Sequence, residues 1–304
     1  MNTLTSTKTT EKRTDWAAYM GAYAELTKLR IGIMVLFTFC VAGVLAAGLS
    51  VNLLTLFYAT VGMFLIAGSG NAMNMYLERY TDFLMPRTAN RPLPAKKLSS
   101  MEVVVFATVC FAVAVAIFFT LVNWQTAVCG IATWILYVWV YTPLKRMTPL
   151  NTEIGAIPGA MPILMGSLAT TGTVDGISWS FFLVLLIWQF PHFMAIAWMY
   201  RKQYELGGLK MITVTDPTGV SAGRKAVSLC IVMIGLSLLP VLTFRTSVHG
   251  ILFAIAALVI SWPYLKASIK FSRDRNDQTA RKLLKASVLY LPLYMLIVVI
   301  GSLS

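Results

Sequence analysis

Long runs of apolar residues dominate the chain, and the short connections between them hold almost all of its charged positions. Nine of these runs have at least 18 residues and contain no Asp, Glu, Lys or Arg. A hydrocarbon core about 30 Å thick requires about 20 apolar residues per helical span. The pattern therefore predicts an all-α, polytopic membrane protein with nine transmembrane helices. The predicted spans cover residues 31–49, 53–77, 103–122, 124–144, 154–174, 176–200, 226–244, 248–265 and 286–303.

The first 30 residues predict a different element. Within residues 16–29, Tyr19, Tyr23, Leu26 and Leu29 fall on one helical stripe, which is typical of a helix lying in the membrane interface. We therefore divide the chain into a cytoplasmic arm with an interfacial helix, residues 1–30, and a nine-helix transmembrane domain, residues 31–304.

Composition agrees with a membrane protein and sets its orientation. The chain is 58% hydrophobic and 12% charged, which is more apolar than a soluble domain. Of its 25 Lys and Arg residues, 24 lie in the connections on one side of the nine spans, and Arg245 alone lies on the other. Because cytoplasmic loops collect basic residues, we expect a cytoplasmic N-terminus and a periplasmic C-terminus. The formal charge of +13 has the same origin, so we expect no nucleic-acid partner.

Features that the sequence lacks bear on where the protein is located and on whether it binds zinc or forms disulfides. The arm has no apolar core of a secretory signal, and Glu11 and Asp15 are unlike an organellar transit peptide. The expected location is the bacterial inner membrane. The four cysteines lie within predicted spans without C-x-x-C spacing, which favours packing over zinc binding or disulfides.

The connection after the second span carries acids in a regular pattern. Asn74, Glu78 and Asp82 are four residues apart and share one helical stripe. Mg²⁺ binds through one or two carboxylates together with substrate phosphates, so this stripe predicts a site for Mg²⁺ and a diphosphate. Arg87 and Arg91 follow, and the planar guanidinium matches phosphate oxygens. On spacing alone, a solvated helix end whose acids pair with nearby arginines fits equally well.

Two further cytoplasmic connections combine polar and basic residues at the ends of spans. Together with the acid stripe, they predict that three connections contribute to one site. They contain Lys145, Arg146, Asn151 and Glu153 after the fourth span, and Arg201, Lys202, Tyr204 and Lys210 after the sixth.

His192 lies well inside the sixth predicted span and follows Pro191. An ionisable or ligating group within a membrane span is a functional candidate by default. A hydrogen-bonded core histidine is the commoner alternative for a single imidazole on an apolar helix, and the sequence pattern leaves both open.

These motifs resemble the intramembrane aromatic prenyltransferases and, within that superfamily, the haem O synthase family. The resemblance extends over nearly the whole chain. It rests on the spacing Asn74-x-x-x-Glu78-x-x-x-Asp82 followed by Arg87-Thr88-x-x-Arg91-Pro92, on Leu26-Thr27-Lys28, Tyr141-Thr142 and Lys145-Arg146, on Trp188-Gln189-x-Pro191-His192, and more weakly on Ala280-Arg281-x-Leu283 with Ser287.

The resemblance implies a helical bundle around a central cavity open to the cytoplasmic side. It also implies farnesyl transfer from farnesyl diphosphate to a vinyl group of haem B, with addition of water, giving haem O. Mg²⁺ is the implied cofactor, and a downstream haem-modifying enzyme or an oxidase assembly factor is a candidate partner. The implied residues are Asn74, Glu78 and Asp82 as metal ligands and, with Lys145, as catalytic groups; Arg87, Arg91, Lys145, Arg146, Arg201 and Lys202 for the diphosphate; and His192 for haem.

The chain departs from the family pattern at three positions. Leu29 replaces a usual Pro, and Glu78 replaces an Asp found in many members. Gln203 stands near an expected acid of the second metal motif, for which Asp216 and Glu205 are candidate substitutes.

Two other functions compete. A sibling prenyltransferase acting on a quinone precursor or a chlorophyll-type acceptor would have the same diphosphate machinery, but phenolic acceptors need no iron ligand at Pro191-His192. A secondary transporter also combines broken helices with polar residues in the membrane. The sequence has no internal repeat, and its acids gather at one end of a span, so transport is the weaker hypothesis.

Overall fold

The computed structural model describes residues 16–243 and 247–303, and this part of the chain is helical without β-strands. Nine of its helical segments are long and apolar enough to cross a membrane, which confirms the predicted number of spans. Lys8, Lys12 and Arg13 of the predicted arm, and Arg245, lie outside the described residues.

The spans follow one another with short connections. Two of the spans contain a π-helical stretch. One is formed by α4 and η2, and the other by α5, η3 and α6. The α-helices are α1 (Trp16–Leu26), α2 (Leu29–Ala47), α3 (Leu53–Leu84), α4 (Ser100–Ile117), α5 (Trp124–Ile135), α6 (Thr142–Met147), α7 (Asn151–Thr171), α8 (Gly176–Met199), α9 (Arg201–Leu206), α10 (Ile212–Thr215), α11 (Val220–Ser237), α12 (Ser247–Arg273) and α13 (Asp277–Leu303), with π-helical η2 (Phe118–Val122) and η3 (Leu136–Tyr141) and 3₁₀-helical η1 (Gly48–Ser50) and η4 (Leu239–Thr243).

Several helices extend beyond the apolar runs. α3 continues to Leu84 instead of residue 77, and α13 begins at Asp277 instead of residue 286. A helix satisfies its own backbone hydrogen bonds, so it need not stop where the hydrocarbon ends. The 32 residues of α3 correspond to about 48 Å, against a hydrocarbon core of about 30 Å. Its last turns therefore have room to project beyond the core.

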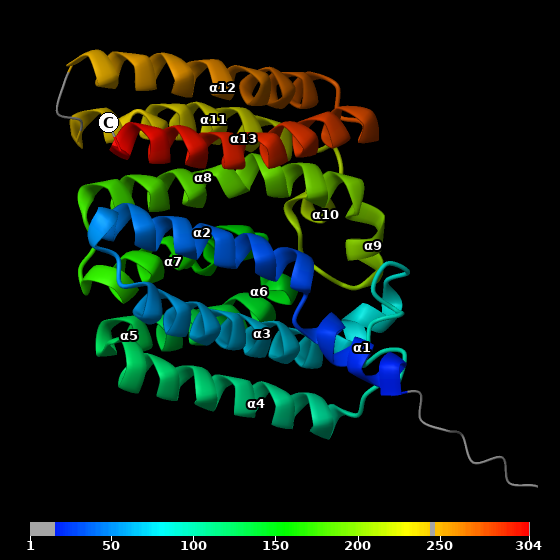
Figure 1. Ribbon diagram of the computed structural model, residues 1–304. Coiled ribbons are helices and arrows are strands. Elements are labelled where there is room, and N and C mark those ends of the chain that lie inside the picture. Colours follow the sequence, from blue (N-terminus) through cyan, green and yellow to red (C-terminus); the bar gives the residue numbers. More distant parts are fainter. Residues whose placement is uncertain (1–15, 244–246, 304) are drawn as a thin grey trace, which may run out of the picture.

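The long helices lie side by side, and their short connections collect at two ends (Figure 1). α8 packs against α7, α11 and α13, while α2 packs against α7 and α3 against α4. α1, α9, α10 and the 85–99 connection all lie at one end of the bundle (Figure 1). This end contains the acid stripe and the connections that the sequence predicts to be cytoplasmic.

Small residues set the contact between α2 and α7. A Cβ atom added to Gly166 would lie 2.2 Å from the carbonyl oxygen of Phe39, and one added to Gly43 would lie 3.1 Å from the carbonyl oxygen of Gly166. The two backbones therefore touch directly, as small residues allow in membrane helix pairs.

The predicted interfacial helix corresponds to α1, but it ends at Leu26. Tyr19, Tyr23 and Leu26 of its stripe pack against side chains of α3 and α4, so the stripe faces protein. Trp16 and Met20 are its exposed large apolar side chains. Contact of α1 with the membrane interface stays a prediction.

Candidate active site

Asn74, Glu78 and Asp82 form one buried face of α3, as their spacing predicts. Their exposed fractions are only 1%, 8% and 1%. Burying two carboxylates is costly unless each one is paired. The expected solvation of this helix end is therefore wrong, although Asp82 does pair with a nearby arginine, Arg91. The partners of the stripe come from three other parts of the chain.

Glu78 is paired by the span that ends in α6. Lys145 Nζ lies 2.8 Å from Glu78 Oε1, and it also lies 4.6 Å from the centroid of the Tyr141 ring. The preceding π-helical segment η3 shifts the helix register, since the Thr142 N–H bonds to the Tyr137 carbonyl five residues back. Glu78 Oε1 is buried, and no hydrogen bond of good geometry reaches it from the described residues.

Asp82 is paired by the connection that follows α3. Arg91 Nη1 lies 2.8 Å from both carboxylate oxygens of Asp82. Thr88 Oγ1 donates to the Asp82 carbonyl at 2.9 Å, which folds the connection back over the end of α3. The connection is thus a turn held onto the acid stripe by Thr88 and Arg91.

Asn74 bonds to residues of two other elements, one earlier and one later in the sequence. Lys28 Nζ donates to Asn74 Oδ1 at 3.1 Å, and Asn74 Nδ2 donates to Thr142 Oγ1 at 3.0 Å. Lys28 has a left-handed backbone with φ 51° between α1 and α2. Burial, followed by the like charges of Arg91 and Lys145, lowers the pKa of Lys28 to about 7.

The other predicted diphosphate ligands are distributed unevenly. Arg146 bonds to the Thr81 hydroxyl of α3, and the Arg87 guanidinium lies 4.7 Å from the Tyr200 ring centroid. Arg201 is instead 3.0 Å from Asp277 of α13, and Lys202 is exposed. The structure thus brings Arg91, Lys145 and Arg146 onto α3, whereas Arg201 and Lys202 have no interaction with the stripe among the described residues.

Gln203 and its candidate substitutes have structural partners. The Arg87 N–H donates to Gln203 Oε1 at 3.2 Å, so Gln203 joins α9 to the turn after α3. Both oxygens of Asp216 accept hydrogen bonds at the start of α11, from Thr218 and Ser221, and these bonds lower the pKa of Asp216 to about 2. Glu205 is exposed. These contacts give no support to a second acidic metal motif.

His192 lies on α8 in neutral, aromatic surroundings. Its ring stacks on Trp188 with a centroid distance of 4.9 Å, and its Nδ1 lies 2.8 Å from Ser287 Oγ of α13. The same serine accepts a hydrogen bond from Trp188 Nε1 at its carbonyl, at 2.9 Å. One residue of α13 therefore fixes both rings.

The hydrogen-bond directions define the histidine tautomer. Ser287 Oγ lies 2.7 Å from the Leu284 carbonyl, to which it donates its only hydroxyl hydrogen. With this hydrogen donated to the carbonyl, Ser287 Oγ is left to accept from His192, which favours the tautomer with the proton on Nδ1. The lone pair of His192 is left on Nε2, the form in which a neutral imidazole binds a metal.

Comparison with known proteins identifies the family of this membrane bundle. Residues 35–290 match the UbiA prenyltransferase family. The chain belongs to this family. The all-α architecture and the resemblance to intramembrane prenyltransferases are thereby confirmed.

Several UbiA relatives are similar over nearly the full chain. A protein named Protoheme IX farnesyltransferase from Rhodopirellula baltica is 41% identical over 286 residues, covering 91% of this chain and 99% of the relative. A protein of the same name from Solibacter usitatus is 37% identical, covering 90% and 96%. The haem O synthase resemblance is therefore confirmed at the level of these relatives.

Solved structures support the fold independently. A structure described as digeranylgeranylglyceryl phosphate synthase has a TM-score of 0.77 at 17% identity, covering 94% of this chain and 99% of that one. A UbiA homologue from Archaeoglobus fulgidus, bound to DMAPP and Mg²⁺, has a TM-score of 0.64 at 16% identity, covering 91% and 99%.

The acid stripe of this UbiA-family chain fits Mg²⁺ only when a ligand supplies further oxygens. In the described part of the chain, no group of three or more His, Cys, Asp or Glu residues is placed to hold a metal ion. Glu78 and Asp82 provide two buried carboxylates, and Glu78 Oε1 lacks a well-formed hydrogen bond. Mg²⁺ that shares phosphate oxygens needs no more protein ligands than this.

Sequence reasoning gave no site role to three residues that the structure places in contact with the candidates. Lys28 and Thr142 bond to Asn74, and Ser287 bonds to His192. All three fall within the motifs that resemble the family, and this position was the signal by which they could have been found. Their spacing from the site in the sequence gave no indication of contact.

Proposed function

We propose that this prenyltransferase moves a farnesyl group from farnesyl diphosphate to a vinyl group of haem B, with addition of water, to give haem O. The observation that carries the proposal is the buried acid stripe with its surplus of cations. Glu78 and Asp82 are surrounded by Lys28, Lys145 and Arg91. The names of the relatives support the choice of farnesyl diphosphate and haem as substrates.

The diphosphate binds where positive charge exceeds negative charge. Arg91, Lys145, Arg146 and Lys28 contact side chains of α3 from neighbouring elements, and they donate to the phosphate oxygens. Arg87 lies on the adjoining turn and closes this side of the site. Arg201 and Lys202 belong to a more distant part of the same end, and we retain them as candidates for contacts that form with substrate.

Asn74, Glu78 and Asp82 would hold Mg²⁺, which supplies positive charge beside the leaving diphosphate when it is bound. The side chains contribute in the same direction. As the C–O bond of the allylic diphosphate breaks, the bonding electrons leave with the diphosphate. Lys145 and the neighbouring arginines are already positioned to stabilise that negative charge.

The farnesyl cation then reacts with the electron pair of a haem vinyl group and forms a C–C bond. Water adds to the resulting cation and loses a proton, which completes the hydroxyethylfarnesyl side chain. Electron-rich rings stabilise a nearby cation. Tyr141 lies next to Lys145 and Trp188 stacks on His192, so aromatic faces are present at both candidate regions.

His192 contacts the haem in this proposal, either as an iron ligand through Nε2 or as a group that orients the macrocycle. The Nδ1–H tautomer set by Ser287 supports this role, because it leaves Nε2 with a lone pair. A phenolic quinone precursor has no metal and would make no use of such a ligand, and the names of the relatives favour haem over a chlorophyll-type acceptor. We therefore favour haem over these acceptors, and prenyl transfer over transport.

The test is expression in a bacterial host that makes haem B but lacks haem O, followed by haem extraction and mass analysis. We expect a haem O product that depends on this chain. Prenylated quinone precursors without haem O would support the sibling activity, and the absence of any prenylated product would contradict the proposal.

We further propose that the protein lies in the bacterial inner membrane, with a cytoplasmic N-terminus and a central substrate cavity open to the cytoplasm. The distribution of basic residues supports this orientation. A reporter fused after Ser304 is expected to be active in the periplasm. Reporter activity in the cytoplasm would show that the orientation or the number of spans is wrong.

A further inference from the structure

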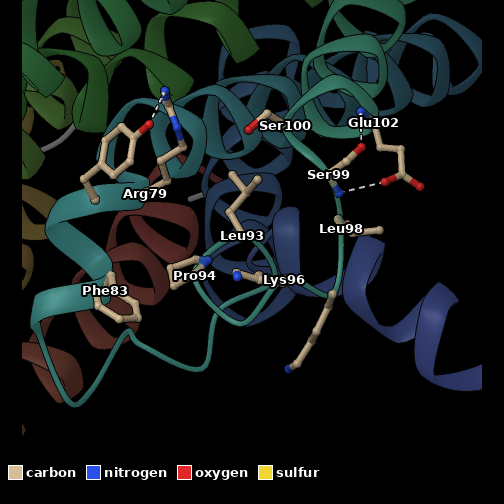
Figure 2. Close-up of a pocket in the computed structure, with 11 residues that line it drawn as sticks. Arg79, Phe83, Leu93, Pro94, Lys96, Leu98, Ser99, Ser100 and Glu102 are labelled. Atoms are coloured by element: carbon tan, nitrogen blue, oxygen red, sulfur yellow. Dashed lines mark hydrogen bonds between the residues drawn. The ribbon is translucent and has the colours of Figure 1, made fainter.

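A basic pocket lies on the same last turns of α3 as the acid stripe, but it is lined by other α3 residues, Arg79, Tyr80 and Phe83. Figure 2 shows the residues that line it. It is formed by the last turns of α3, the turn at residues 93–98 and the start of α4. Its volume is about 660 Å³, enough for a phosphodiester headgroup. Three cations, Arg79, Lys96 and Lys97, line it together with the apolar side chains of Phe83 and Leu93. The proposed prenyl transfer uses none of these residues.

Arg79 is held in position without a carboxylate partner. Its guanidinium carbon lies 4.4 Å from the ring centroids of both Tyr76 and Tyr80, and its Nη1 donates to the Tyr76 carbonyl at 2.7 Å. The ion pairs among residues 16–243 and 247–303 include neither Arg79 nor Lys96. An arginine that is oriented but not neutralised is suited to bind an external anion.

The one acid of the pocket is engaged elsewhere. Glu102 accepts a hydrogen bond from the Ser99 N–H at 2.7 Å as part of the capping box of α4, and it also bonds to the Tyr19 hydroxyl of α1. Lys97 pairs with Glu25 of α1 at 3.6 Å. The charge available to a ligand therefore comes from Arg79 and Lys96 and is positive.

The pocket lies where a membrane surface is expected. α3 and α4 are both spans, and the connection between them forms part of the pocket wall. Two aromatic side chains that line it are exposed, with fractions of 68% for Tyr80 and 66% for Phe83. Aromatic rings concentrate at the headgroup level of a membrane.

We propose that this pocket binds an anionic phospholipid, with Arg79 and Lys96 contacting the phosphate and the exposed rings of Tyr80 and Phe83 lying against the headgroup and glycerol region. A small free anion would use the cations but leave the apolar rim without a partner. A lipid satisfies both parts at once. Basic clusters next to a span attract anionic headgroups in this way.

The test compares lipid retention by native mass spectrometry of the full-length protein. Purified protein is titrated with phosphatidylglycerol or phosphatidylcholine, and one phosphatidylglycerol is expected to be retained in preference. The variant Arg79→Gln/Lys96→Gln is expected to reduce this retention by about 30-fold, given the usual contribution of each of two basic residues near an anionic headgroup. The control, Lys266→Gln/Lys270→Gln, removes two exposed lysines of α12 and is expected to retain the lipid.

Other outcomes would overturn the proposal. Equal lipid loss in the control would mean that only the overall charge matters, and equal competition by inorganic phosphate would mean a free-anion site. A change in dimer population without a change in lipid retention would mean that the pocket contacts a second copy. If the double variant does not fold, Lys96→Gln alone provides the test, because Lys96 is exposed. Farnesyl diphosphate binding is expected to persist in all variants, which separates this proposal from the proposed function.

Discussion

The acid stripe of α3 and the histidine region of α8 are built on opposite principles. At the stripe, the buried groups are charged, and they are compensated by cations from the α1–α2 junction, the 85–99 connection and α6. At His192, the groups are neutral, and one serine of α13 orients two stacked rings. In the proposed function, the first region holds and releases the diphosphate, and the second holds the flat acceptor.

The difference shows how one bundle can separate two kinds of chemistry. Charge stabilisation needs preorganised ions near the leaving group, whereas an allylic cation survives only where water and stray nucleophiles are excluded. Substitutions in one region should therefore leave ligand binding in the other intact. The following predictions test this separation, beginning with the largest expected effect.

Removing a charge from the acid stripe should have the largest effect. Glu78→Gln and Asp82→Asn keep the side-chain shape but lose the carboxylate, and we expect each to reduce kcat by about 10²- to 10³-fold. Haem affinity is expected to stay within about twofold, because His192 and its partners lie on α8 and α13. Product formation by mass analysis and haem titration measure the two quantities.

Asp274→Asn is the matched control, since Asp274 is an exposed acid at the end of α12. It is expected to retain activity. Near-normal turnover of Glu78→Gln at limiting Mg²⁺ would show that the metal site lies elsewhere.

Removing the His192 imidazole should have the next largest effect, and this effect should fall on haem binding. We expect His192→Ala to weaken haem binding on the order of 100-fold, equivalent to about 2.7 kcal/mol. Farnesyl diphosphate affinity is expected to be unchanged. His249→Ala, which removes the other histidine of the chain, is the control. Equal loss of both affinities would indicate a packing role, and an unchanged haem absorption spectrum would exclude iron ligation.

Lys28 provides a sharper test of the charged region, because sequence reasoning gave it no role there. We expect Lys28→Met to weaken farnesyl diphosphate binding by about tenfold, the usual value of one charge-assisted hydrogen bond. Haem binding should persist. Lys266→Met removes an exposed lysine and is expected to bind both ligands normally. An unchanged diphosphate affinity in Lys28→Met would mean that Lys28 only supports Asn74.

The smallest expected effect is at Ser287. Ser287→Ala removes the acceptor that fixes the His192 tautomer, and we expect haem affinity to fall by about three- to tenfold, as for one neutral hydrogen bond. Ser287→Thr keeps the hydroxyl and should restore the haem spectrum. Loss of thermal stability in Ser287→Ala with no spectral change would show that the serine only packs.

The extent of sequence prediction differs between the two regions for a physical reason. The nine spans and the Asn74–Glu78–Asp82 face follow from periodicity, which a single helix expresses within its own residues. Lys28, whose own backbone is left-handed, bonds to Asn74, which lies 46 positions away in the sequence. Ser287 bonds to His192, which lies 95 positions away. Such contacts depend on how helices pack, which no local pattern encodes. The helical spacing of Glu78 and Asp82 already predicted that α3 continues past its apolar run, whereas the start of α13 at Asp277 was missed, because charge marks the end of hydrocarbon and not the end of a helix.

The pairing of the α3 acids also constrains how the protein is made. The second span leaves the ribosome before the fourth, so Glu78 is synthesised long before Lys145 exists to pair with it. An unpaired carboxylate in hydrocarbon is costly, and the long α3 can hold its last turns at the water boundary during this interval. The acid stripe is therefore buried by later helices during assembly, and the site becomes dry only when insertion of the fourth span is complete.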